Sequence, residues 1–154
     1  MNKKIILFFA TGFYSGYLPL APGTFGTIAG LPFVFVLLII EPYYYTFYII
    51  GLILVSIYLS DKASKILKEQ DPGCIVIDEI AGYVLTMSLV KINLFSLIAG
   101  FIIFRFFDIT KCKFVKYFEN NFSGGAAIVL DDIMAGFLSA FVLKVTLLSY
   151  ANIF

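Results

Sequence analysis

The chain has 154 residues, of which 61% are hydrophobic and 14% are charged, and its mean hydropathy is +0.99. Because a soluble domain has ~25% charged residues, this composition indicates an integral membrane protein, folded as a single domain over residues 1–154. The net charge of +1 provides no basic surface for nucleic acid. The chain has no histidine, which excludes the Ser-His-Asp triad and the lipid phosphatases that attack through a histidine.

The N-terminal forty residues predict one membrane span preceded by an irregular segment. Residues 5–18 are apolar but contain two glycines and are short for a spanning helix of ~20 residues, so we expect an interfacial or re-entrant segment. Residues 19–27 are rich in proline and glycine and predict a loop. A helix over residues 27–40 is expected to begin there. Free N–H groups at such a helix start favour an anion, although a capped turn between two membrane segments explains the same residues.

The remaining apolar runs predict an all-α protein. A second span covers residues 43–60, begins with interfacial tyrosines and ends at Ser60-Asp61, where a short polar helix follows. Further apolar segments cover residues 75–90, 94–107 and 130–150, separated by a turn at 91–93 and a polar stretch at 112–125. We therefore predict an integral membrane helical bundle with four or five spans and short cytoplasmic helices and loops.

The lysines and the arginine predict the orientation of this bundle, because positive residues near segment ends lie on the cytoplasmic side. These residues are Lys3 and Lys4, the Lys62–Lys68 cluster, and Arg105 to Lys116. The same topology then places five carboxylates on the cytoplasmic face, and this convergence indicates one site: Asp78, Glu79, Asp108, Asp131 and Asp132. Cys74 and Cys112 fall on the same side, so we expect reduced thiols.

Two acidic pairs, Asp78-Glu79 and Asp131-Asp132, form near-copies that each precede an Ala-Gly step. Charges at the edges of apolar segments are costly and normally face a bundle interior or a water-filled site. A structural explanation is that the pairs are helix N-terminal charges that favour the helix dipole. Gly82 and Gly136 follow the pairs by one helical turn, and small residues there allow close helix approach. Such an approach would bring the two pairs together.

Five carboxylates with an arginine and a lysine predict a site for magnesium and phosphate. Mg²⁺ prefers oxygen ligands and is commonly bound by a few carboxylates together with substrate phosphate. Phosphoryl transfer needs mainly positioning and charge neutralisation from the protein. Arg105 could equally pair with Asp108 or extend to the membrane interface.

Four motifs in chain order resemble those of the phosphatidylglycerophosphatase A family and together span residues 12–138. They are Pro19-x-Ala21-Pro22-Gly23-Thr24-x-Gly26-Thr27-x-x-Gly30-Leu31-Pro32, Asp71-Pro72 with Ile75-Val76-Ile77-Asp78-Glu79-x-x-Gly82, Phe104-Arg105-Phe106-Phe107-Asp108-Ile109-x-Lys111, and Gly124-Gly125 with Asp131-Asp132-x-x-Ala135-Gly136. The chain departs from the family at Cys112 and Phe114, where members usually have proline, and at Ala126-Ala127.

The resemblance implies a multi-pass enzyme of the bacterial inner membrane, with its active site facing the cytoplasm. Such an enzyme hydrolyses phosphatidylglycerol phosphate to phosphatidylglycerol and inorganic phosphate with Mg²⁺, in phospholipid biosynthesis. The family also has soluble relatives with a related helical fold, but the hydrophobicity of this chain favours a lipid substrate.

On this basis we predict three roles for the site residues. The predicted metal ligands are Asp78, Glu79, Asp131 and Asp132, and these four with Asp108 hold the metal or orient the attacking water. The predicted phosphate-binding groups are Arg105, Lys111, Gly23, Thr24 and Gly26. The sequence does not decide which carboxylate is the base, or the oligomeric state.

Two other classes of protein could contain some of these features. A transporter or channel subunit could use the carboxylates as a cation site, but it would favour charges deep in several spans rather than at one face. A structural membrane protein leaves the convergence of Arg105 and Lys111 with five acids unexplained.

Overall fold

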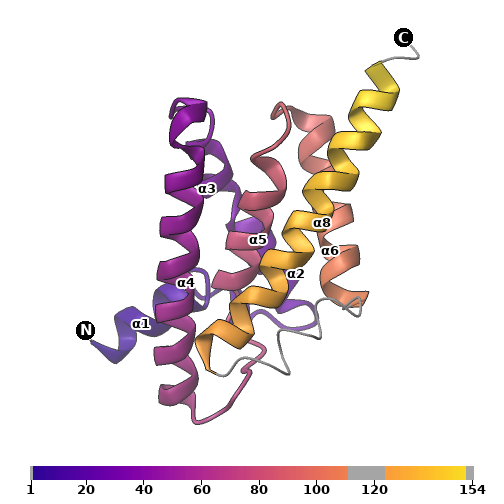
Figure 1. Ribbon diagram of the computed structural model, residues 1–154. Coiled ribbons are helices and arrows are strands. Elements are labelled where there is room, and N and C mark those ends of the chain that lie inside the picture. The colour runs from indigo at the N-terminus through magenta and orange to yellow at the C-terminus, as the bar shows by residue number, and fades with distance from the viewer. Residues whose placement is uncertain (1, 111–123, 152–154) are drawn as a thin grey trace.

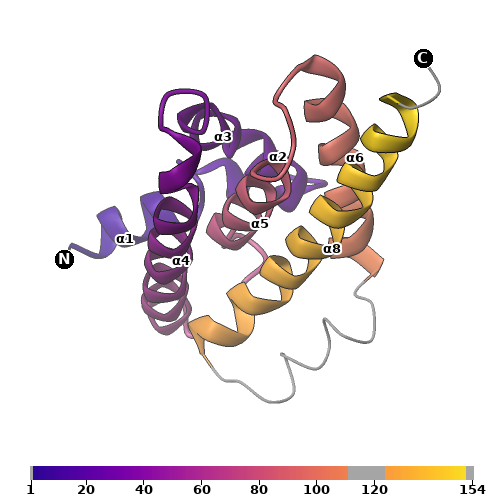
Figure 2. The same cartoon turned by 45° about the horizontal axis from the view of Figure 1, so that its top comes forward.

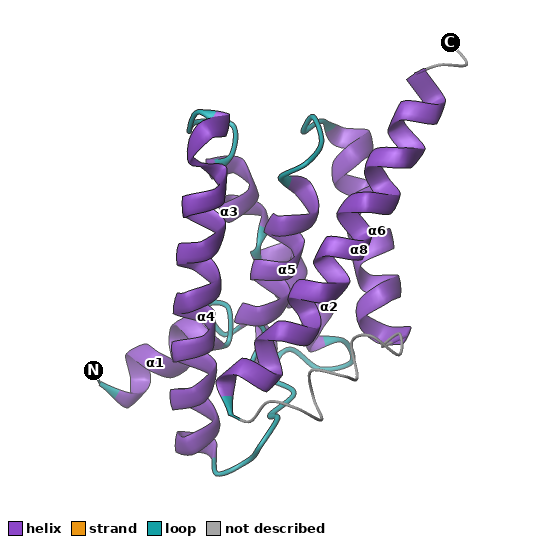
Figure 3. Ribbon diagram, viewed as in Figure 1, coloured by secondary structure: helices purple, strands orange, loops and turns teal. Residues whose placement is uncertain are grey.

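The computed structural model describes residues 2–110 and 124–151, and each regular element in that part of the chain is a helix (Figure 3). The prediction of an all-α protein is therefore confirmed for these residues. The α-helices are α1 (Lys3–Ala10), α2 (Pro22–Ala29), α3 (Leu31–Val36), α4 (Tyr45–Leu67), α5 (Ile77–Met87), α6 (Leu94–Thr110) and α8 (Gly125–Ala151). Two short 3₁₀ helices, η1 (Ser15–Tyr17) and η2 (Pro42–Tyr44), lie between them.

The predicted helix over residues 27–40 is wrong, because this stretch contains parts of two short helices. The first of them, α2, already begins at Pro22, in the first turn where proline is favoured since its missing N–H would be unpaired there in any case. It ends at Gly30, and α3 begins at once with a second proline, Pro32, near its start. Because Pro32 has no N–H group, it cannot continue the hydrogen bonds of α2. Residues 22–27 of the predicted glycine loop thus form the first turns of a helix.

The predicted separate polar helix after Ser60-Asp61 is also wrong, because these residues continue the helix of the second apolar segment. The helix α4 continues through the lysine cluster to Leu67 and ends at Lys68, which has the left-handed φ of 59°. No glycine or proline interrupts residues 52–71, and Lys65 pairs with Asp61 at 2.7 Å across one helical turn. The polar turns are therefore an extension of the apolar helix rather than a separate element.

The central element of the bundle is α5, which packs against α4, α6 and α8 and also meets α2 and α3 (Figures 1 and 2). Its residues are buried on all sides, and Tyr83, Val84 and Met87 form the core with Phe104 of α6 and Leu143 of α8. This explains why its sequence is apolar on all sides after the Asp78-Glu79 pair, apart from Thr86. With 11 residues, α5 is ~16 Å long, about half the hydrocarbon thickness of ~30 Å.

Two helices in the described part of the chain are long and apolar enough to cross a membrane, Pro42–Leu67 and Gly125–Ser149. The predicted count of four or five spans stays a prediction. Cys74 is a free thiol, and Cys112 lies outside the described residues.

The crossing of α5 and α8 depends on two glycines. A Cβ atom on Gly136 would lie 3.0 Å from the Cα and carbonyl carbon of Gly82, closer than ordinary carbon contacts of ~3.5–4.0 Å. At the same point the Thr86 hydroxyl donates to the carbonyl oxygens of Gly82 (2.9 Å) and Gly136 (3.2 Å). The predicted close approach of the two helices at Gly82 and Gly136 is confirmed.

Several helix ends meet at one end of the bundle. The C-terminal ends of α4 and α6 and the N-terminal ends of α5 and α8 all lie toward the lower end of the view in Figure 1. Gly125 sits against the backbone of α4, because a Cβ atom on Gly125 would lie 2.5 Å from the backbone nitrogen of Asp61, and the Gly125 N–H donates to the Asp61 carboxylate. This contact fixes the start of α8, and with it the height of the acidic pair Asp131-Asp132 beside α5.

Candidate metal and phosphate site

Three carboxylates from two helices meet at this end of the bundle. Asp78, Glu79 and Asp132 each offer one oxygen, and the three oxygens lie within 4.8 Å of one another. Asp78 is 7% exposed and Asp132 is 5% exposed, and the side chain of Glu79 is 14% exposed. We call these three residues the acid trio. The close crossing at Gly82 and Gly136 brings them together, because Asp78 and Asp132 each lie one helical turn before their glycine.

The position of each acidic pair along its helix tests the explanation that these pairs are charges at helix N-termini, placed there by the helix dipole. Asp78 and Glu79 lie in the first turn of α5, where the helix dipole favours negative charge. Asp131 and Asp132 follow Gly125, the first residue of α8, by more than one turn, and the first turn of α8 has no acidic residue. The dipole effect fades within the first turn, so it does not account for the second pair.

Asp131 is not a member of the acid trio, although it is equally buried at 5% exposure. Adjacent residues on an α-helix point about 100° apart, and in α8 it is the carboxylate of Asp132 that lies with those of Asp78 and Glu79. In both pairs the carboxylate of the first residue accepts a hydrogen bond from the backbone N–H of the second at 3.1 Å. Asp131 instead lines a neighbouring pocket.

Arg105 of α6 lies beside the acid trio. Its guanidinium pairs with Asp108, one turn later on the same helix, and its Nη1 lies 3.9 Å from Oε1 of Glu79. Asp108 is thus placed to hold Arg105. The Nε of Arg105 and the Oε2 of Glu79 are both buried and have no hydrogen-bond partner among the described residues. A buried polar atom without a partner is costly, so both atoms are suited to a ligand.

The start of α2 closes this side of the site. A Cβ atom on Gly23 would lie 2.7 and 2.8 Å from the two terminal nitrogens of Arg105 and would also meet Oε1 of Glu79. Only glycine therefore lets α2 approach so closely. The first N–H groups of a helix have no partner within the helix, and Gly23, which carries one of them, lies beside the Arg105 guanidinium.

The charges in this site do not balance. Asp78, Glu79, Asp132 and Asp108 bring four carboxylates to one guanidinium within a largely buried volume. Burying unpaired charged carboxylates is strongly unfavourable, so these groups either take up protons or bind a cation, and the arrangement is suited to a bound cation. Oxygens on opposite sides of Mg²⁺ would be ~4.1 Å apart, so the three oxygens of the acid trio, which lie within 4.8 Å of one another, could share one such ion after a small movement of the side chains. An all-oxygen donor set also matches the preference of Mg²⁺ rather than that of zinc or copper.

The chain matches the family model described as Phosphatidylglycerophosphatase A over residues 8–147. Phosphatidylglycerophosphatase A of Escherichia coli (strain K12) is 36% identical to it over 135 residues, which cover 87% of this chain and 78% of that protein. The chain belongs to the phosphatidylglycerophosphatase A family.

Two further relatives support this assignment. Phosphatidylglycerophosphatase A of Haemophilus influenzae is 31% identical over 135 residues, covering 86% of this chain and 83% of that protein. A protein of Bacteroides thetaiotaomicron, named a putative phosphatidylinositol-3-phosphatase, is 32% identical over 143 residues, covering 88% of this chain and 89% of that protein. No solved structure matches the chain. The resemblance found in the four motifs is thus confirmed at the level of the phosphatidylglycerophosphatase A family.

The structure places the other predicted phosphate-binding residues of this family member in different surroundings. Gly26 packs on the side chain of Val76, so its missing side chain serves the contact between α2 and the start of α5. Thr24 lies in the first turn of α2. Thr27, the next threonine of the first motif, donates its hydroxyl to the Gly23 carbonyl at 2.8 Å. Lys111 lies outside the described residues.

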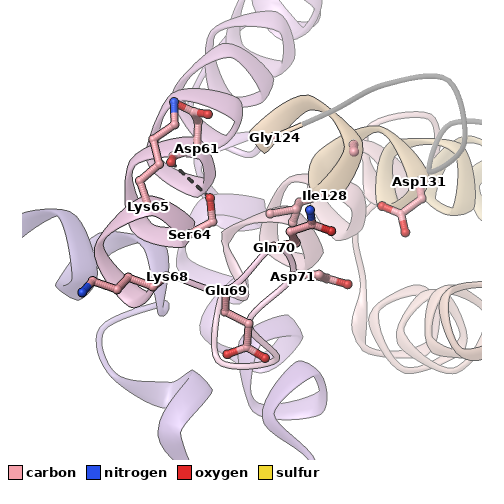
Figure 4. Close-up of a pocket in the computed structure, with 11 residues that line it drawn as sticks. Asp61, Ser64, Lys65, Lys68, Glu69, Gln70, Asp71, Gly124, Ile128 and Asp131 are labelled. Atoms are coloured by element: carbon pink, nitrogen blue, oxygen red, sulfur yellow. Dashed lines mark hydrogen bonds and ion pairs between the residues drawn. The ribbon is translucent and has the colours of Figure 1, made fainter.

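A second feature of this end of the bundle was not predicted. A pocket of about 500 Å³ lies between the end of α4, the loop that follows it and the start of α8, and Asp131 forms one of its walls (Figure 4). In the sequence, its lysines were interpreted as markers of orientation, and Asp71 as part of the second family motif. The polar residues from 61 to 71 indicated a polar segment, but they did not indicate that it would lie opposite the start of α8.

Proposed function

We propose that this protein is a Mg²⁺-dependent phosphatase that hydrolyses phosphatidylglycerol phosphate to phosphatidylglycerol and inorganic phosphate, in phospholipid biosynthesis. The observation that carries the proposal is the acid trio beside the partly unpaired Arg105 and the start of α2. Family membership supports the phosphatase activity and a phospholipid substrate, because two relatives carry the name phosphatidylglycerophosphatase A.

The acid trio would hold the metal ion. Asp78, Glu79 and Asp132 supply the oxygen ligands, and the unpartnered Oε2 of Glu79 is available without breaking another contact. When bound, Mg²⁺ neutralises negative charge on the phosphoryl oxygens and lowers the pKa of bound water. The predicted ligand Asp131 is placed outside this group, and we assign it a separate role in proton transfer.

The phosphate group would bind on the α2 side of the trio. Arg105 offers its buried Nε, and the start of α2 offers the N–H groups of Gly23 and Thr24, which favour an anion through both hydrogen bonds and the helix dipole. Asp108 holds the guanidinium in place through its ion pair with Arg105. Water attacks phosphorus, the bond from phosphorus to the alcohol oxygen breaks, and a proton is delivered to that leaving oxygen.

The outer faces of the long helices support a membrane location. The side chains of Phe47 and Leu54 on α4 are 65% and 62% exposed, and those of Phe137 and Phe141 on α8 are 56% and 65% exposed. Contiguous apolar surface of this kind marks a contact with lipid or another protein. We place the protein in the bacterial inner membrane as one multi-pass domain over residues 1–154, with the acidic end of the bundle facing the cytoplasm.

The competing assignment, a transporter or channel subunit with a carboxylate cation site, is not favoured. In such a protein the charges would line a path through several spans. Here the acidic residues cluster at one end of the bundle, next to an arginine that would repel a passing cation.

The proposal is tested with purified protein in detergent micelles. Phosphate release from phosphatidylglycerol phosphate should require Mg²⁺, stop with a chelator and exceed release from phosphatidylinositol 3-phosphate at equal concentration. The variants Asp78→Asn and Asp131→Asn should each abolish turnover while retaining the thermal stability of a folded protein. A correctly folded wild-type protein that releases no phosphate from this lipid would overturn the substrate assignment, and near-normal rates in a variant would make that residue structural.

A further inference from the structure

One side of α6 is apolar and exposed from the first residue of the helix to its last turn. The exposed fractions are 74% for Leu94, 54% for Ile98, 61% for Ile102 and 69% for Ile109. These four residues follow one another at spacings of four or seven positions, so their side chains share one side of the helix. We call them the α6 stripe. Arg105 follows Ile102 by three positions and precedes Ile109 by four, which places it on the same side.

Arg105 connects the α6 stripe to the candidate site. Its side chain is only 14% exposed, because its guanidinium turns inward to Oε1 of Glu79 and to Gly23 at the start of α2. A phosphate held by this guanidinium is therefore next to the stripe. From Leu94 to Arg105 the stripe is ~16 Å long, about half the hydrocarbon core of ~30 Å, which is the depth of one leaflet. The stripe thus matches the chain of a lipid whose headgroup lies at Arg105.

The other route to the acid trio, through the pocket beside Asp131, is less suited to an anionic lipid. Two lysines and four carboxylates line this pocket, and two positive with four negative charges leave a formal net charge of −2. One of the lysines, Lys65, is already paired with Asp61. Such walls repel an anionic headgroup. The two routes are distinct, because α4, which forms a wall of this pocket, and α6 lie on opposite sides of α5 (Figures 1 and 2).

We infer that the lipid substrate reaches the site across α6, with an acyl chain on the α6 stripe and its terminal phosphate at Arg105. The inference rests on the proposed phosphatase function. The glycerol and the second phosphate that join the terminal phosphate to the acyl chains remain at the membrane surface, where water solvates their charge. Because the attacking and leaving oxygens of phosphoryl transfer lie roughly in line, a lipid on the α6 side leaves the side of Asp131 to the attacking water. This arrangement agrees with the role in proton transfer proposed for Asp131.

The experiment replaces two residues of the α6 stripe by alanine, which preserves the helix. The double variant Ile98→Ala/Ile102→Ala is compared with Ile50→Ala/Leu54→Ala on α4. This matched control has the same spacing of four positions and nearly the same exposed fractions, 50% for Ile50 and 62% for Leu54. Both variants lose similar contact with detergent, so a difference between them reports on the substrate.

Each protein is assayed in detergent micelles with phosphatidylglycerol phosphate as substrate and inorganic phosphate as a competitive inhibitor. The stripe variant should raise KM for the lipid roughly 3–10-fold, because an acyl chain loses part of its apolar contact. The kcat should stay within about twofold, since the contact is the same before and during the reaction. The inhibition constant for inorganic phosphate should not change, because inorganic phosphate has no acyl chain. The control variant should keep the wild-type values.

Equal KM values for the lipid in the stripe variant and the control variant would overturn the inference. A parallel weakening of inhibition by inorganic phosphate would overturn it too, because the substitutions would then act on the phosphate site itself. Both results leave the phosphatase function intact as long as the wild-type protein turns over the lipid. Absence of wild-type turnover is the separate result that removes the function and this inference with it. The single variants Ile98→Ala and Ile102→Ala test the inference if the double variant fails to fold.

Discussion

The crossing of α5 and α8 provides the sharpest test of how this fold builds its site. In Gly136→Ala, the new Cβ atom would lie 3.0 Å from two carbon atoms of Gly82, where carbon contacts normally measure ~3.5–4.0 Å. Relieving this contact requires the two helices to separate by about 0.5–1 Å. Asp132 lies one turn before Gly136, so it moves away from Asp78 and Glu79 by a similar distance.

A displacement of ~1 Å in an active site can lower the rate about 100-fold, so we expect Gly136→Ala to lower kcat roughly 10–100-fold. The added methyl group should also destabilise the bundle by ~1–3 kcal/mol through overpacking. The assays are Mg²⁺-dependent phosphate release and thermal unfolding in the same detergent, with a Mg²⁺ titration of the unfolding temperature. Binding of Mg²⁺ should weaken together with kcat, since both depend on the spacing of the acid trio.

Gly51→Ala is the control, because a Cβ atom at Gly51 meets no atom within 4 Å. In the middle of α4 this change should stabilise the helix by ~0.5–1 kcal/mol and leave turnover unchanged. A Gly136→Ala protein with wild-type kcat and wild-type Mg²⁺ affinity would refute the argument that the glycine crossing positions the carboxylates.

Three further predictions concern the charges of the site. Asp132→Asn removes one of several buried like charges, so without metal the variant should unfold at a higher temperature than wild type, where ~1 kcal/mol corresponds to roughly 2–4 °C at this size. The variant should also lose the stabilisation that Mg²⁺ gives to the wild-type protein. An unchanged Mg²⁺ response in thermal unfolding would remove Asp132 from the metal site. Arg105→Lys keeps the charge but loses the planar fork that Asp108 holds, so KM for the lipid should rise at least about tenfold, and kinetics equal to wild type would show that a point charge suffices. Gly23→Ala pushes a methyl group against the Arg105 guanidinium and should raise the inhibition constant for inorganic phosphate, again with Gly51→Ala as the control; unchanged inhibition would place phosphate elsewhere.

The sequence by itself determined the helical class, the clustering of acids at one end and the contact of the two glycines. These features depend on local spacing: a long apolar run predicts a helix, and a glycine one turn after a carboxylate lies on the same helix face. The family could also be recognised from four motifs, because they lie in order along the chain.

Helix boundaries were less well determined. Pro22 marks the true start of α2, since proline is favoured in a first helical turn, but the density of prolines and glycines around it predicted a loop. The continuation of α4 past Asp61 depends on the pairing of Asp61 with Lys65 and with the N–H of Gly125. The second of these partners is more than 60 residues away, so local sequence could not indicate it.

Only the tertiary structure separated Asp131 from Asp132. Their adjacency predicted that both would hold the metal, but the structure brings the carboxylate of Asp132 to Asp78 and Glu79, and the rotation of α8 against α5 decides which residue of the pair takes this place. That rotation is set by Gly82 and Gly136 in contact and by Gly125 against α4. The same packing creates the pocket beside Asp131, because its walls come from segments far apart in the chain. A pattern of residue types records which groups are present, and the packing of helices decides which of them share a site.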